Sequence, residues 1–125
     1  MQILIADNNS IERSALELVL KNINGIKTTL GVPSFIELSN QLNKFKPDMI
    51  LLEWNLVKDI AEEASILLKA TKTHYLIILG DRKEFEKDAI AFGADDFIVK
   101  DKPLERLYFL INEFIKTKKK KIKEL

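Results

Sequence analysis

The chain has 125 residues, of which 46% are hydrophobic, so it is long enough for one domain with a buried core. The formal net charge is +1, but six of the 20 basic residues lie in the last ten positions, which leaves 14 basic and 18 acidic side chains in residues 1–115. This mildly acidic body argues against a nucleic-acid-binding domain, and the lack of cysteine excludes disulfides and thiolate chemistry.

Five short apolar runs predict the strands. They occupy residues 2–6, 26–32, 49–53, 75–80 and 96–100. Three of them, "QILIA", "MILLE" and "YLIILG", are continuous rather than alternating, which is typical of strands that are covered on both faces of a parallel sheet.

Segments with apolar residues at helical spacing lie between and after these runs. They predict helices over residues 10–22, 34–45, 61–70, 83–92 and 103–116. In the first helix, Asn9 or Ser10 can cap the start, and one face is formed by Ile11, Ala15, Leu18 and Val19. In the last helix, Pro103 opens the first turn, and the inward face is formed by Leu107, Leu110, Ile111 and Phe114.

The alternation of five strands with five helices predicts an α/β fold, in which helices cover both faces of a doubly wound parallel sheet. In such a sheet the functional crevice lies beyond the carboxyl ends of the strands, where the strand order reverses. The candidate site residues are therefore those that end or directly follow a predicted strand, namely Asp7, Asn8, Glu53, Gly80 and Lys100.

Four segments carry a resemblance to a known family. In chain order they are "ILIADNN", "PDMILLEWNL", "LIILGD" and "GADDFIVKDKPLERL". They resemble the first, third, fourth and fifth strands of the receiver domains of two-component response regulators, with the residues that follow them. The resemblance extends over residues 2–116 and implies a flavodoxin-like, five-stranded parallel (β/α)5 sheet in the order 2-1-3-4-5.

The resemblance implies a role for each strand end, and the chain departs from three of these roles. Glu53 stands at the phosphoacceptor position in place of aspartate. Asn8 replaces the second residue of an acidic pair, and Gly80 replaces a switch hydroxyl. Asp7 and Lys100 match the family's pattern, and we expect Lys100 to reach back towards Glu53.

These departures all affect one reaction. The family holds Mg²⁺ with two or three carboxylates, and Asn8 removes one negative charge from that set. Glu53 is one methylene longer than aspartate, and a misplacement of about 1 Å can slow a reaction about a hundredfold. We therefore expect Mg²⁺ to bind weakly at most, no other metal or cofactor, and no catalytic residue or enzyme activity.

Two functional hypotheses are open. The favoured one is a phosphorylation-independent, receiver-like signalling module that acts through protein–protein interaction in a two-component-type pathway. The alternative is a phosphorylatable response regulator that uses Glu53 or a nearby carboxylate such as Asp59, as the N-terminal part of a DNA-binding regulator. A flavin or cobalamin protein of similar architecture is disfavoured, because "DNNSIERS" contains no glycine and His74 is badly placed.

The resemblance also implies a partner-binding face, formed by helix 83–92, strand 96–100 and helix 103–116. Phe97 matches the family's switch aromatic, although packing alone would explain it equally well. Arg106 and Tyr108 are the interface candidates, and Tyr108 is expected near the surface because it lies opposite the inward face of its helix. The sequence does not identify the protein partner, and a homodimer through the same face is the second choice.

The chain divides into a receiver-like domain, residues 1–116, and a lysine-rich tail, residues 117–125. The tail can be the fraying end of the last helix, the start of a linker, or a weak anchor for nucleic acid or acidic membranes. No signal-peptide pattern opens the chain, and no apolar run approaches the ~20 residues of a membrane span. We therefore expect a cytoplasmic protein with no membrane span and without nucleic acid as its partner.

Overall fold

The computed structural model describes residues 1–71, 74–100 and 104–124, with side chains up to Lys118. Its strands form one parallel sheet in the order β2-β1-β3-β4-β5, which confirms the predicted fold class and strand order. The strands are β1 (Gln2–Ala6), β2 (Thr28–Val32), β3 (Met49–Glu53), β4 (Tyr75–Gly80) and β5 (Asp96–Val99).

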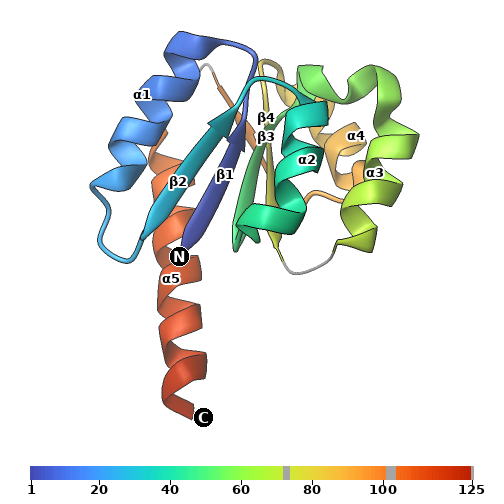
Figure 1. Ribbon diagram of the computed structural model, residues 1–125. Helices are drawn as coiled ribbons and strands as arrows, with labels where there is room; N and C mark the ends of the chain where they lie inside the picture. The colour runs from blue at the N-terminus through green and yellow to red at the C-terminus, as the bar shows by residue number, and fades with distance from the viewer. Residues whose placement is uncertain (72–73, 101–103, 125) are drawn as a thin grey trace.

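Helices cover both faces of this sheet (Figure 1). One face packs against α1 (Ser10–Lys21) and α5 (Glu105–Glu124). The other packs against α2 (Phe35–Phe45), α3 (Ala61–Ala70) and α4 (Glu86–Phe92). Three short 3-10 turns complete the described elements: η1 (Trp54–Leu56), η2 (Lys58–Ile60) and η3 (Lys83–Phe85). The segment predicted as one helix over 83–92 is therefore η3 followed by α4, and Pro103 lies outside the described residues.

Strand β3 lies at the centre of the sheet and is buried along its whole length. Successive side chains of a strand point to opposite faces. Ile50 and Leu52 pack in the core under α2, α3 and α4, whereas Met49 and Leu51 pack under α1 and α5. By the same alternation Glu53 shares the face of Met49 and Leu51, so its carboxylate emerges on the α1 and α5 side.

Helix α1 buries a different face from the one that the residue spacing indicated. Leu16 and Leu20 pack on the sheet, while the residues of the expected stripe are exposed: Ile11, Ala15, Leu18 and Val19. Two contacts explain this rotation of the helix. Arg13 Nη1 donates a hydrogen bond to the Asp7 carbonyl, at 2.7 Å, and Glu12 contacts Lys100 beyond β5. Because Glu12, Leu16 and Leu20 are spaced four residues apart, turning Glu12 inward turns both leucines inward.

Helix α5 continues as a helix to Glu124, eight residues beyond the predicted end, and its last turns project past the sheet (Figure 1). Lys118 forms an ion pair with Asp48, whose carboxylate also accepts the Gln2 N–H at 2.8 Å. The backbone therefore shows no break between residues 1–116 and the lysine-rich tail. Within the described part of the chain, no helix combines the length and apolar content needed to cross a membrane.

Candidate functional site

Four charged side chains meet beyond the carboxyl ends of β1, β3 and β5. The Lys100 ammonium nitrogen lies 3.2 Å from Asp7 Oδ2 and 2.7 Å from Glu53 Oε2. It also contacts Glu12 Oε2, from the first turn of α1. The side chains of Asp7 and Glu53 are only 6% and 4% exposed, and that of Lys100 is 21% exposed. One ammonium group therefore faces three carboxylates, of which Asp7 and Glu53 are buried and Glu12 is half-exposed.

The backbone places each of these groups. Asp7 directly follows β1, and its Oδ1 accepts the Asn9 N–H at 2.9 Å. Asn9 in turn caps α1 by accepting the N–H groups of Ile11 and Glu12, which confirms the expected cap. The Lys100 N–H donates to the Gly80 carbonyl at 2.8 Å, so the end of β5 is fixed to the end of β4.

The two oxygens of the Glu53 carboxylate have different partners. Oε1 accepts a hydrogen bond from Asn55 Nδ2 at 3.2 Å. Oε2 lies against the Lys100 ammonium as an ion pair without the alignment of a directed hydrogen bond. Each oxygen of the Glu53 carboxylate thus has one partner, Asn55 for Oε1 and Lys100 for Oε2.

Burial and charge act in opposite directions on the ionisation of this cluster. Burial raises the pKa of Glu53, and contact with Lys100 only partly offsets this, while the charges of Asp7 and Glu12 add to the increase. Burial alone would lower the pKa of Lys100, but its contacts with Glu12 and Glu53 and the charge of Asp7 outweigh burial, so that its pKa is raised. Lys100 is therefore firmly cationic.

These residues do not fit the Mg²⁺ site that the resemblance implies. Lys100 places its own positive charge between the carboxylates of Asp7, Glu12 and Glu53. Asn8 follows Asp7 but is exposed. Over the described ranges, no three or more His, Cys, Asp or Glu side chains are grouped so as to hold a metal ion. The Glu53 carboxylate is instead paired with Lys100 and Asn55, and the exposed Asn8 amide adds no negative charge beside Asp7.

The structure thus brings together three of the predicted site residues, Asp7, Glu53 and Lys100, and adds one that the sequence reasoning missed. Glu12 lies five residues after Asp7, in the first turn of α1. An acidic residue there is usually explained by the helix dipole. The sequence does contain an indication of its role. Glu12 lies four residues before Leu16 and eight before Leu20, so it shares the helix face that turns towards the sheet.

Gly80 is enclosed by an aromatic ring. A Cβ atom added at Gly80 would lie 2.8 Å from both Cε2 and Cζ of Phe97, closer than real Cβ contacts. Phe97 is 5% exposed, so its ring cannot move aside into solvent without leaving the core. The Phe97 ring therefore fills the space that a side chain at position 80 would occupy, and the proposed switch role of Phe97 stays a prediction.

The two interface candidates lie on different sides of α5. Arg106 Nη2 is 3.2 Å from Asp96 Oδ1 and borders a hollow of about 450 Å³ between α4, β5 and α5. Tyr108 instead lines a groove between α1 and α5 and is half-buried, which corrects its expected position at the surface beside Arg106. The exposed aromatic of α5 is Phe109. Asp101 and Lys102, which join the strand and the last helix of the predicted face, lie outside the described residues.

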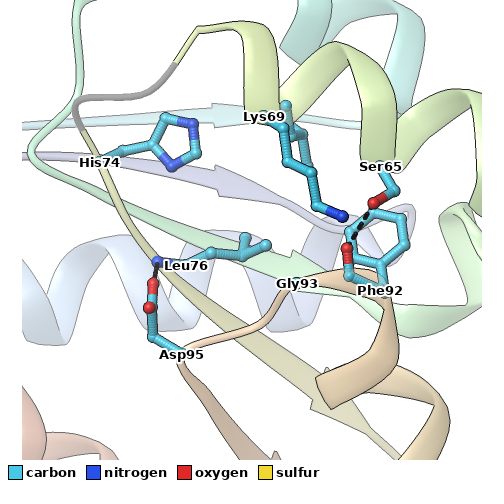
Figure 2. Close-up of a pocket in the computed structure, with 8 residues that line it drawn as sticks. Ser65, Lys69, His74, Leu76, Phe92, Gly93 and Asp95 are labelled. Atoms are coloured by element: carbon cyan, nitrogen blue, oxygen red, sulfur yellow. Dashed lines mark hydrogen bonds between the residues drawn. The ribbon is translucent and has the colours of Figure 1, made fainter.

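A second cavity of about 330 Å³ lies at the opposite end of the sheet (Figure 2). His74 borders one end of it and is half-buried, and burial lowers the pKa of its imidazole. At the other end Ser65 Oγ donates to the Phe92 carbonyl at 2.5 Å (Figure 2). Because His74 precedes β4 and Lys100 follows β5 in a parallel sheet, this cavity is separate from the charged cluster.

The chain matches no family model. Over 120 residues, 93% of this chain, it is 23% identical to the oxygen regulatory protein NreC of Staphylococcus aureus, and it spans only 55% of the length of that relative. The receiver domain of the Francisella response regulator 1452 superposes with a TM-score of 0.78 at 23% identity, covering 94% of this chain and 98% of that one. The N-terminal domain of an uncharacterized protein from Wolinella succinogenes superposes with a TM-score of 0.80 at 21% identity, covering 97% and 98%. The chain therefore has the fold of response-regulator receiver domains.

Proposed function

We propose that this chain is a receiver-like signalling module of a two-component-type pathway, that its output does not depend on phosphorylation, and that it acts in the cytoplasm by binding another protein rather than as an enzyme. The observation that carries this proposal is the position of Lys100, whose ammonium group is held between Asp7, Glu12 and Glu53. The receiver-domain fold supports the type of pathway, and the charged cluster supports the independence from phosphorylation.

Phosphoryl transfer to Glu53 would have to dismantle this cluster. A carboxylate oxygen must attack phosphorus in line with the leaving group, and the transferred group brings further negative charge. Both oxygens of Glu53 are engaged, by Asn55 and Lys100, in a site that already contains Asp7 and Glu12. Without a divalent cation the incoming phosphoryl group would meet the carboxylates of Asp7 and Glu12, whose two charges Lys100 compensates only in part, and this opposes its approach.

The chain also lacks the hydroxyl group through which a receiver domain usually responds to phosphorylation. Gly80 has no hydroxyl group that could donate to a phosphoryl oxygen, and the Phe97 ring fills the adjacent space. We therefore infer that packing of Phe97 beside Gly80 keeps the surface formed by α4, β5 and α5 in one arrangement. This supports constitutive recognition of a partner over a phosphorylation-driven switch.

A second candidate function is a phosphorylatable regulator that uses Glu53. It is favoured by the convergence of a carboxylate at the end of β3 with Asp7 and Lys100. This candidate includes a role as the N-terminal part of a DNA-binding regulator, and it is compatible with the chain spanning only 55% of the length of NreC. Phosphorylation of the purified chain separates the two candidates.

We expect no acyl phosphate when the chain is incubated with acetyl phosphate and Mg²⁺, as measured by intact mass.

Mg²⁺ binding is measured separately, by fluorescence. Trp54 directly follows Glu53 and is buried, so its fluorescence serves as the probe, and we expect no saturable change on addition of Mg²⁺. The Asn8→Asp/Glu53→Asp double variant is the matched control, because it restores the acidic pattern and should bind Mg²⁺. Glu53→Asp alone should be phosphorylated slowly and without a conformational response, since Gly80 is unchanged. A mass increase in the unmodified chain would refute phosphorylation independence.

The hollow bordered by Arg106 is the proposed docking site for the protein partner. It lies between α4, β5 and α5, and its rim carries both signs of charge, with Lys83, Glu86, Glu105 and Arg106. We expect Arg106→Glu to reduce partner recovery in a pull-down, because it reverses the charge at the rim and breaks the contact with Asp96. Lys116→Glu, an exposed change further along α5, should leave recovery unchanged. Equal recovery with both variants would place the partner on another face.

A further inference from the structure

We propose that the cavity at the amino ends of β4 and β5 binds a small zwitterion, namely an α-amino acid with an apolar side chain. This is the cavity of about 330 Å³ that Lys69, His74 and Asp95 border, and we call it the β4–β5 cavity (Figure 2). The proposal goes beyond the function proposed above, because it concerns the opposite end of the sheet and involves no residue of the charged cluster.

The size and the apolar lining of the β4–β5 cavity suit a ligand as large as an amino acid. Its volume lies near the lower end of the range of small-molecule sites, which is about 300–1,000 Å³. Leu68, Leu76 and Phe92 line it and are all buried, so they belong to the packed core. A ligand would therefore meet a fixed apolar wall with room for one apolar side chain.

Two opposite charges line the same cavity without pairing with each other. Lys69 extends over it from the end of α3, and Asp95 approaches it from the residues just before β5 (Figure 2). In the part of the chain that the structure describes, neither side chain forms an ion pair. A molecule that carries both charges can contact both groups, with its carboxylate at Lys69 and its ammonium at Asp95.

Hydrogen bonds fix Asp95 and the helix that carries Lys69. Asp95 Oδ2 accepts the Leu76 N–H at 2.7 Å, and the Asp95 N–H donates to the Leu76 carbonyl at 2.8 Å. On the other side, the bond from Ser65 Oγ to the Phe92 carbonyl ties α3 to the end of α4. Because these positions are set before a ligand arrives, binding costs little ordering of the protein.

His74 adds a hydrogen-bonding group near Asp95. Both ring nitrogens are buried, and neither has a hydrogen-bond partner among the described residues. Burial lowers the pKa of this imidazole, and the charge of Asp95 opposes that only in part, so the ring is neutral at pH 7. A neutral imidazole has one donor and one acceptor nitrogen. The acceptor suits the ammonium group that Asp95 attracts.

The combination of these groups favours a zwitterion over a simple anion or cation. An anion would contact Lys69 but would also bring negative charge towards Asp95. A cation would contact Asp95 but would bring positive charge towards Lys69. An α-amino acid matches both ends, and its apolar side chain covers the wall between them.

NMR titration of the isotope-labelled full chain with L-phenylalanine tests the proposal. The amide signals of Leu76 and Gly93, which line the cavity, should shift and saturate with a Kd below about 1 mM. Phenylpropionate lacks the ammonium group and phenethylamine lacks the carboxylate, so each should bind at least about tenfold more weakly. Unchanged spectra with both L-phenylalanine and L-leucine, or equal affinity for the three phenyl compounds, would overturn the proposal.

Two charge-removing variants test how the ligand is held. Lys69→Met and Asp95→Asn should each weaken L-phenylalanine binding at least about tenfold. Asparagine at position 95 can still accept the Leu76 N–H, so this variant removes the charge and keeps the backbone contact. The matched control is Lys87→Met, exposed on α4 outside the cavity, which should bind like the unmodified chain. Equal weakening by the two methionine variants, or full affinity in Asp95→Asn, would show that these charges do not bind the ligand.

Discussion

Lys100→Met should lower the free energy of unfolding by about 3 kcal/mol at neutral pH, because it removes the ammonium group that contacts Asp7, Glu12 and Glu53. Asp7 and Glu53 are almost fully buried and cannot recover hydration when the ammonium is lost. Their mutual repulsion, together with that of Glu12, then opposes folding. Chemical denaturation of both proteins, analysed with a common m-value, measures the difference.

The loss should depend on pH, with a defined sign. Burial already raises the pKa of Glu53 above its ordinary value, and Lys100 is the group that counters this. Without Lys100 the pKa of Glu53 rises further, so the folded state binds a proton more tightly than the unfolded chain. Stability of the variant then increases as pH falls towards that raised pKa, and the full penalty applies above it. We expect the difference between the proteins to be smaller at pH 5 than at pH 8.

Lys87→Met is the matched control for this prediction. Lys87 is exposed on α4, so the same substitution removes one positive charge without uncovering buried acids. We expect its effect to stay within about 0.5 kcal/mol and to change little with pH. If the two methionine variants lose equal stability, the charged cluster is not a significant stabilising unit, and the main support for the proposed function is lost.

The sequence predicted correctly those features of the fold that depend on the burial of whole strands. The continuous apolar runs around Ile3 and Ile50 are short, which is typical of strands with two covered faces, and the order of such strands followed from the resemblance. Convergence of Asp7, Glu53 and Lys100 followed because each lies at a strand end, and parallel strands bring their carboxyl ends to one edge. These inferences needed only local pattern and topology.

The rotation of α1 and the surroundings of Tyr108 on α5 were not accessible in the same way, although the inward face of α5 was predicted correctly. Both sides of α1 carry apolar residues, so periodicity cannot distinguish the Leu16 face from the Ile11 face. The choice depends on Glu12 meeting Lys100, 88 residues away, which is a long-range contact. On α5, the angle between Tyr108 and Leu107 predicts a surface position, but Tyr108 lines the groove between α1 and α5 and is half-buried. Packing partners distant in sequence, rather than propensity, determined both outcomes.

Gly80→Thr and Phe97→Ala should each destabilise the chain but should partly compensate when combined. A side chain at position 80 would meet the Phe97 ring at 2.8 Å, and overpacking of this kind costs about 1–3 kcal/mol. Truncating a buried phenylalanine costs about 3–5 kcal/mol through the cavity it leaves. In the double variant the threonine occupies part of that cavity, so we expect a favourable coupling of about 1–2 kcal/mol in a double-mutant cycle.

Phe35→Ala is the control for this cycle, because Phe35 is a buried aromatic on α2 and is not among the atoms nearest to Gly80. Its cost should add to that of Gly80→Thr. Additivity in both cycles would mean that the Phe97 ring does not limit the space at position 80, and the proposed fixed arrangement of this surface would fail. Coupling confined to Phe97 would mean that restoring a hydroxyl at position 80 requires the ring to move. A phosphorylation response could then return only in a chain that combines Asn8→Asp, Glu53→Asp and Gly80→Thr with a smaller residue at position 97.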